Sequence, residues 1–272
     1  MVPMILVPPS IAQPPPRSCQ GLRAVLLLTL CAQLASGCSQ PSPALGPTQP
    51  SPPPGTSSIR VLMLTATAGF RHDSIPAARQ VMTALGPANG FTVTATEDLA
   101  LLTTTALAGY DVLFFALTSG ELALSADQKG AVLAFVAGGK GFVGAHSAAD
   151  TLHGWPEYRQ LVGASFKAHP WTAPGRVAVE DRTHATTAGL GDVFEITEEF
   201  YTFTDNPRPR VHVLLRLDPA SVGSAGDYPL AWTLSYGSGR GYYNGLGHFD
   251  ATWRDPGFQR QLAAAMRWAA GR

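Results

Sequence analysis

The sequence predicts an α/β protein of flavodoxin-like type, with three layers, a mostly parallel sheet and a second half elaborated by loops. Short apolar runs alternate with stretches of helical pattern, which indicates parallel strands with helices on both faces of the sheet. The run at residues 110–116 is apolar almost throughout, as expected of a strand buried on both faces. We expect one folded domain at residues 59–272, which is long enough to bury a sizeable core.

The first half of this domain gives the clearest order of elements. Residues 60–65 form an apolar run that predicts the first buried strand. Ser74 can cap a helix that has Pro76 near its first turn and runs to about residue 85. Residues 90–96 alternate between apolar residues and threonines, which predicts the second strand.

The following segments continue the same alternation. Residues 110–116 predict the third strand, and Ser125 to Gln128 resembles a capping box that opens a helix through residue 137. The glycines that follow end this helix, and residues 140–145 predict the fourth strand. The second half is less regular: it holds four strand-like runs and a final amphipathic helix, at residues 176–180, 211–217, 230–234, 241–245 and 256–270.

Residues 1–37 have the pattern of a bacterial lipoprotein signal peptide. Arg17 and Arg23 precede an apolar run that is shorter than the roughly 20 residues a membrane-spanning helix needs. Residues 34–38 resemble a lipoprotein cleavage box, which predicts lipidation of Cys38. We therefore expect an exported protein that a lipid anchor holds in the cell envelope, on its periplasmic or extracellular face, with simple secretion as the alternative.

The remaining composition restricts the chemistry and the partners. Residues 38–58 are rich in Pro and Ser and predict an extended tether. The three cysteines, Cys19, Cys31 and Cys38, all lie at or before the predicted cleavage point, so the domain has neither a disulfide nor a thiol nucleophile. The formal net charge is +0 and no basic cluster stands out, which makes nucleic acid an unexpected partner.

His146 is the first residue that we consider for chemistry. It lies in a stretch of small residues, 141–150, that reads as a buried strand ending in a sharp turn. Turns at the carboxyl ends of strands are where open α/β sheets place their ligands. The alternative is a buried histidine that is hydrogen-bonded to its neighbours.

Two further histidines follow predicted strands. His72 comes after the first strand, and His248 comes after the last. Because the carboxyl ends of parallel strands share one edge, we expect His72, His146 and His248 to meet in one crevice. If they do not, they are unrelated surface or capping residues.

Other residues supplement this cluster. Imidazole needs an orienting partner to act as a defined acid or base, and Glu199, in an acidic and aromatic segment read as a loop, is the candidate second acid or base. We expect a set of polar and aromatic residues to bind substrate, since flat rings suit sugars. This set is Arg71, Asp150, His169, Tyr201 and Trp232.

Several of these segments together resemble the trehalose-utilisation (ThuA-like) family of the class I glutamine amidotransferase-like superfamily. The matching segments lie at residues 69–76, 141–151, 163–170, 198–201, 229–232 and 239–248. The resemblance implies a flavodoxin-like fold and a role in carbohydrate metabolism. It does not imply amidotransferase activity, because the superfamily's catalytic cysteine is replaced by His146 and the domain has no cysteine.

Three functions remain open. The first is a hydrolase or lyase that acts on a saccharide or keto-sugar, with His146 as general acid or base and His72 and His248 stabilising charge or binding a metal. The second is a metal-dependent hydrolase that holds a divalent ion such as zinc. The third is a sugar-binding lipoprotein without catalysis. The sequence identifies no definite cofactor, and the expected partners are a small saccharide and, through the anchor, a membrane.

Overall fold

The computed structural model describes residues 58–272. The predicted signal peptide, the lipidation site at Cys38 and nearly all of the tether lie outside the described residues. The predicted domain, residues 59–272, falls within the described part.

One nine-stranded sheet organises the domain, and its strand order is β2-β1-β3-β4-β9-β8-β7-β5-β6. The first five strands in this order are parallel: β2 (Phe91–Thr96), β1 (Ile59–Leu64), β3 (Val112–Ala116), β4 (Gly141–Ala145) and β9 (Gly239–Asn244). This 2-1-3-4 order with the last strand alongside is that of flavodoxin-like folds. The predicted fold class is therefore confirmed.

The second half of the chain extends the sheet with antiparallel strands. These are β8 (Tyr228–Tyr236), β7 (His212–Leu217), β5 (Phe166–Val179) and β6 (Val193–Phe203). The segment around Glu199, read from the sequence as a loop, lies within β6, and His169 lies within β5. Polar residues such as Glu195 and Thr197 make β6 hard to recognise in the sequence, because this edge strand is exposed on one side over its first half.

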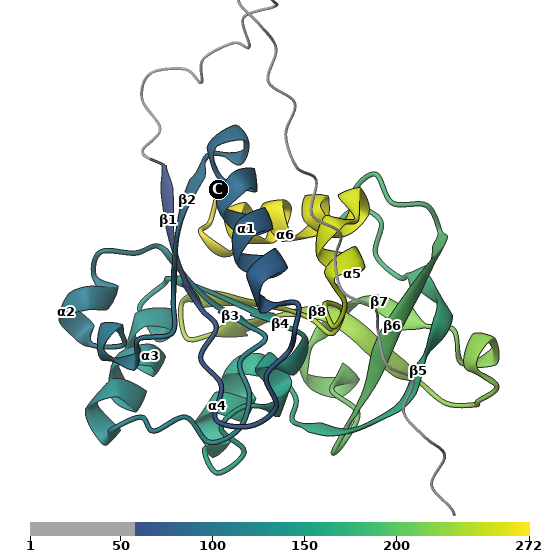
Figure 1. Cartoon of the computed structure of the whole chain (residues 1–272), viewed down its shortest axis with the longest axis horizontal. Helices are drawn as coiled ribbons and strands as arrows, with labels where there is room; N and C mark the ends of the chain where they lie inside the picture. The colour runs from purple at the N-terminus through teal and green to yellow at the C-terminus, as the bar shows by residue number, and fades with distance from the viewer. Residues whose placement is uncertain (1–57) are drawn as a thin grey trace, which may run out of the picture. The chain divides into compact units, whose positions relative to one another are not determined.

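The helices cover both faces of the sheet (Figure 1), and each face has its own apolar core. The helices α1 (Ile75–Leu85) and α6 (Pro256–Ala269) pack on one face, together with the short α5 (Asp250–Arg254). On the other face lie α2 (Thr104–Leu107), α3 (Ala126–Ala137) and α4 (Pro156–Val162). Short 3-10 turns complete the chain at Pro87–Asn89, Leu99–Leu101, His146–Asp150, Arg208–Arg210 and Pro219–Val222.

Local chemistry explains where α3 begins and gives Ser74, the residue before α1, a different role. The backbone N–H of Gln128 donates to Ser125 Oγ (3.2 Å), and the N–H of Ser125 donates to Gln128 Oε1 (2.9 Å), so the predicted capping box opens α3. Ser74 precedes α1 as predicted but does not cap it. Its hydroxyl donates to the carbonyl of Gly247 (3.2 Å) and thereby joins two loops at one edge of the sheet.

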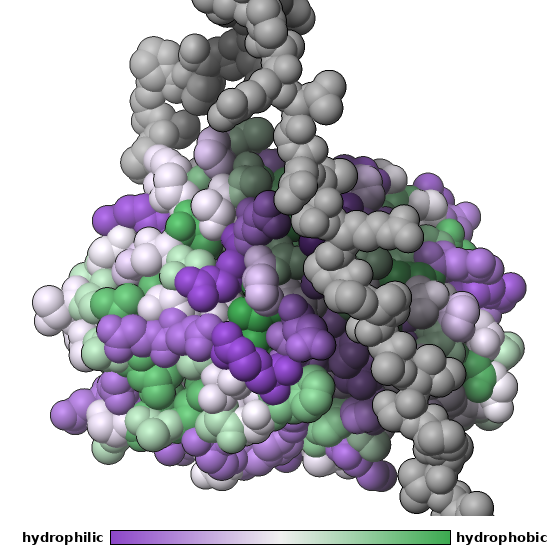
Figure 2. All heavy atoms as spheres, in the orientation of Figure 1, coloured by the Kyte–Doolittle hydropathy of each residue, from purple (hydrophilic) through white to green (hydrophobic). Residues whose placement is uncertain are grey.

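The surface is mixed in character. On the part of the face visible in Figure 2, polar and apolar residues alternate without one broad apolar area. The large apolar side chains that stay exposed among residues 58–272 are Phe70 and Val193. No helix within this described range has the length and apolar character that crossing a membrane requires.

Candidate functional site

His146 occupies a strained turn at the carboxyl end of β4. Its φ of 50° lies in the left-handed region, which side chains other than glycine adopt at a cost of about 1–3 kcal/mol. The sharp turn predicted from the small neighbouring residues is therefore present. The His146 side chain is fully buried, and its Nδ1 lies 2.9 Å from the carbonyl oxygen of Gly245. Since a carbonyl only accepts, this contact fixes the proton of the ring on Nδ1.

His72 is held by the loop that follows β1. The N–H of Ala68 donates to the carbonyl of Ser119 (2.8 Å), and the Ser119 hydroxyl donates to the carbonyl of Phe70. These contacts anchor the loop to the segment after β3. They leave the buried ring of His72 edge-on to that of His146, with centroids 4.8 Å apart.

His248 is positioned by Glu198, a residue that the sequence analysis did not select. The fully buried carboxylate of Glu198 accepts from the N–H groups of Gly247 (2.9 Å) and His248 (3.1 Å), and from the hydroxyl of Thr252. It therefore holds the loop after β9 by charge-assisted hydrogen bonds. The sequence offers no signal for this role, because an acidic residue beside another acidic residue does not indicate which one is buried.

Glu199 brings a carboxylate to these histidines from β6. Its Oε2 lies 3.4 Å from Nε2 of His146 and 3.2 Å from Nδ1 of His248. Its Oε1 lies 3.3 Å from Nδ1 of His169, which comes from β5. The acidic side chain thus has imidazoles on both of its oxygens.

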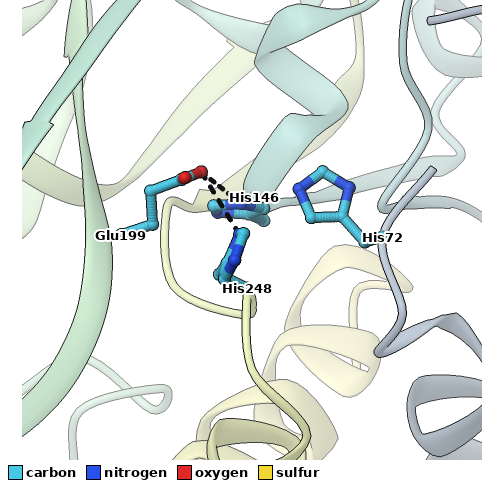
Figure 3. A group of neighbouring side chains, drawn as sticks. All are labelled: His72, His146, Glu199 and His248. Atoms are coloured by element: carbon cyan, nitrogen blue, oxygen red, sulfur yellow. Dashed lines mark ion pairs between the residues drawn. The ribbon is translucent and has the colours of Figure 1, made fainter. Parts of the chain in front are cut away.

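The structure brings the four predicted catalytic residues together. One donor atom from each of His72, His146, Glu199 and His248 lies within 4.8 Å of the others. Figure 3 shows the four side chains pointing toward a common space from separate parts of the chain. Three nitrogen donors and one carboxylate form a set that can bind a zinc-type ion or transfer protons.

Burial and charge set the protonation of this cluster. Burial, reinforced by neighbouring His146 and His248, lowers the pKa of His72 to about 3, so this ring is neutral. Burial opposes ionisation of Glu199, but its contacts with His146 and His248 hold its pKa below the usual range. The contact with Glu199 raises the pKa of His248, although burial opposes this. Glu199 is therefore a carboxylate beside an imidazole that protonates readily.

A cleft of about 220 Å³ opens onto the cluster. Its volume is below the roughly 300–1,000 Å³ of pockets for drug-sized ligands and suits a smaller molecule. Besides His72 and Glu199, five residues line it: Phe70, Asp150, Phe166, His169 and Tyr201. The predicted substrate-binding residues Asp150, His169 and Tyr201 are therefore at the cleft, and the rings of Phe70 and Phe166 were not anticipated.

Two of the predicted substrate-binding residues lie elsewhere. Arg71 turns to the surface, where both of its terminal nitrogens bond to the carboxylate of Glu97 (3.0 and 2.8 Å). Trp232 is fully buried in the core, donates from Nε1 to the carbonyl of Val162 (2.9 Å) and stacks on Tyr243. Neither side chain lines the cleft.

Comparison with solved structures shows the same fold in other proteins. A ThuA-like protein from Bacteroides uniformis has a TM-score of 0.67 and 25% identity, covering 84% of this chain and 95% of the other. A ThuA-like protein from Parabacteroides merdae has a TM-score of 0.65 and 19% identity, covering 78% of this chain and 90% of the other.

A third structure extends the likeness to the class I glutamine amidotransferase-like fold. It is a protein from Thermoplasma acidophilum named as part of a GMP synthase, with a TM-score of 0.52 and 12% identity, covering 80% of this chain and 96% of the other. No curated protein matches the chain. The sequence profile described as ThuA, trehalose utilisation, matches residues 60–269.

Proposed function

The chain belongs to the ThuA (trehalose utilisation) family, and we propose that it is an exported enzyme that acts on a saccharide or keto-sugar by acid–base chemistry. The observation that supports this most is the convergence of His72, His146, Glu199 and His248 beside a cleft that His72 and Glu199 line. Strained backbone at His146 supports a functional rather than a merely structural turn, since strain persists at sites where the surrounding structure maintains it.

The lining of the cleft favours a sugar ring as the substrate. The aromatic faces of Phe70, Phe166 and Tyr201 can cover the apolar face of a ring. Asp150 and His169 offer polar groups to hydroxyls at the same cleft. Trehalose utilisation, the description of the family, supports the same class of substrate.

The protonation of the cluster favours a hydrolase or lyase. His248 can donate a proton, because the Glu199 carboxylate beside it stabilises the imidazolium. Neutral His72 can position the reacting group without adding charge. Thiol-based amide transfer is excluded, since His146 occupies the turn and residues 59–272 contain no cysteine.

Export and lipid anchoring form a separate part of the proposal. They are supported by the basic, apolar and small-residue pattern that ends at Cys38. Replacement of Cys38 by Ser should move the protein from the membrane fraction to the soluble fraction of cells. If the variant stays in the membrane fraction, Cys38 is not the anchor.

The enzymatic proposal is tested by a screen of disaccharides and their 3-keto forms. Wild type should convert at least one of them, and His146→Ala and His248→Ala should each lower the rate by about 10²–10⁴-fold, the usual effect of removing a proton-transfer group. His212→Ala is the control, because this exposed histidine at the start of β7 bonds to Asp181. Calorimetric binding of a sugar without turnover would instead identify a binding protein.

A further inference from the structure

We propose that His72, His146, Glu199 and His248 bind one divalent metal ion of the zinc class. This proposal goes beyond the carbohydrate function and does not depend on the identity of the substrate. It rests on the arrangement of the donor atoms within the cluster.

The first observation is the tautomer of His146. Its Nδ1 carries the proton, because it contacts the carbonyl oxygen of Gly245. The Nε2 of the neutral ring therefore presents a lone pair, and it does so 3.4 Å from the Glu199 carboxylate. Two electron-rich atoms face each other in a buried place, which is stable only when a cation or an added proton lies between them.

The second observation is that the same carboxylate oxygen faces two rings. Oε2 of Glu199 lies near Nδ1 of His248 as well as near Nε2 of His146. Among residues 58–272, both nitrogens are buried and have no partner in hydrogen-bonding geometry. One added proton can serve only one of these contacts, whereas one ion placed among the donors would satisfy all of them.

The third observation is an outer layer around His146, His248 and Glu199, of the kind that orients the donors of metal sites. Gly245 fixes the ring of His146, and Glu198 fixes the backbone of His248. His169 lies 3.3 Å from the second oxygen of Glu199, which leaves Oε2 for the ion.

The size of the cluster fits a zinc-class ion. Donors at about 2.1 Å from zinc are separated from one another by about 3.4–4.2 Å. The present donors lie within 4.8 Å of one another, so the widest pair would move closer by roughly 1 Å on binding an ion.

His72 and Glu199 also line the cleft, which gives an ion access to water and substrate, as catalytic sites need. With an ion bound, the imidazoles would act as its ligands. A water molecule bound to the ion would then supply the proton for acid–base chemistry.

Metal titration of the untagged full chain tests the proposal. After dialysis against a chelator, calorimetry should show that the protein binds about one equivalent of Zn²⁺. Added Co²⁺ should give the visible absorption that is typical of a site with a low coordination number. His146→Gln and Glu199→Gln should each weaken Zn²⁺ binding by at least about 10–100-fold, since even outer-layer changes have effects of that size. The three cysteines are present in wild type and in every variant, so any difference in Zn²⁺ affinity between these proteins comes from the cluster.

His184→Gln is the matched control, because Nε2 of His184 is also buried without a hydrogen-bond partner in the described part of the chain, but lies outside the cluster. It should bind Zn²⁺ as tightly as wild type does. The proposal is overturned if wild type binds no more tightly than folded His146→Gln and Glu199→Gln, with folding checked by circular dichroism. If one of these variants does not fold, the Zn²⁺ affinity of the other, compared with that of wild type, tests the proposal. Turnover of a sugar by chelator-treated protein would support the proposed function and contradict the metal proposal. Zn²⁺ binding without turnover of any sugar would support the metal proposal and contradict the proposed function.

Discussion

Glu198 and Glu199 are adjacent in one strand but act on different parts of the site. Side chains alternate along a strand, so the two carboxylates leave β6 in different directions. Glu198 accepts backbone N–H groups and holds the loop that carries His248, whereas Glu199 faces the imidazoles themselves. Glu198 is therefore a positioning residue, and Glu199 is the one that can touch a ligand.

Arg71, at the same scale, serves stability. Its bond to Glu97 lowers the pKa of that carboxyl below the ordinary value of 4.5. A depressed carboxyl pKa stabilises the fold above pH 4.5, and this contribution is lost as the pH falls through the folded-state pKa. Both side chains are more than a third exposed, so Arg71→Ala should lower the free energy of unfolding by only about 0.2–1 kcal/mol at neutral pH.

Urea unfolding at several pH values measures this effect. The difference between wild type and Arg71→Ala should shrink in acid and in high salt. Arg79, 3.6 Å from Glu97, retains part of the effect, so Glu97→Gln should show the larger loss. A difference that does not change with pH would show that Arg71 acts through packing instead.

The convergence of the histidines could be derived from the sequence, whereas Glu199 was named only as a candidate acid or base and Glu198 was missed. Each histidine follows a strand of the parallel half, and the shared edge of such strands brings His72, His146 and His248 together. Glu199 belongs to a strand at the far end of the strand order, so its approach depends on the path of the whole sheet. For Trp232 the sequence-based prediction is wrong. This aromatic residue in a matching segment was predicted to bind substrate, but it packs in the core.

At the scale of elements, the loop after β9 depends on one glycine. Gly247 has a φ of 130°, in the region that favours glycine, and a Cβ there would lie 3.3 Å from Trp253 and 3.5 Å from His146. The positive φ is therefore what favours glycine here, since a Cβ would make only one slightly tight contact, with Trp253. Gly130, in the exposed interior of α3, differs because an added Cβ would meet nothing within 4 Å.

The two glycines predict opposite effects for the same substitution. Gly247→Ala should lower the free energy of unfolding by about 1–3 kcal/mol through backbone strain. Gly130→Ala should raise it by about 0.5–1 kcal/mol, because alanine favours the helix. Thermal or urea unfolding of both variants beside wild type measures the signs. Equal effects would contradict the conformational reason given for Gly247.

The elements themselves were predictable to different degrees. The parallel strands β1, β3 and β4 are almost entirely buried, and their continuous apolar runs mark them in the sequence. Only the last part of β5 was predicted, since its first part contains Pro170 and Pro174 and polar residues. These prolines are tolerated because that part of β5 pairs with β6 alone, which leaves its other side free of ladder hydrogen bonds.

At the scale of the whole domain, the cluster joins the two halves of the sheet. His72, His146 and His248 belong to the parallel half, and Glu199 belongs to the outermost antiparallel strand. In strand order, four strands lie between β4 and β6, yet Glu199 reaches within 3.4 Å of His146. The antiparallel half must therefore curve back over the edge where the parallel strands end, and the site exists only while both halves hold this arrangement.

An ion bound by all four residues should consequently stabilise both halves together. A ligand at 100 times its dissociation constant adds about 2.7 kcal/mol to the stability of the state that binds it. Amide hydrogen exchange that occurs through opening of β6, or of the loops carrying His72 and His248, should then slow by up to about 100-fold when Zn²⁺ is added. Glu199→Gln should abolish the effect in β6 and leave a smaller one in the histidine loops. If Zn²⁺ slows exchange in those loops of the wild type but not in β6, Glu199 is not a ligand, and the antiparallel half is held to the parallel half by packing alone.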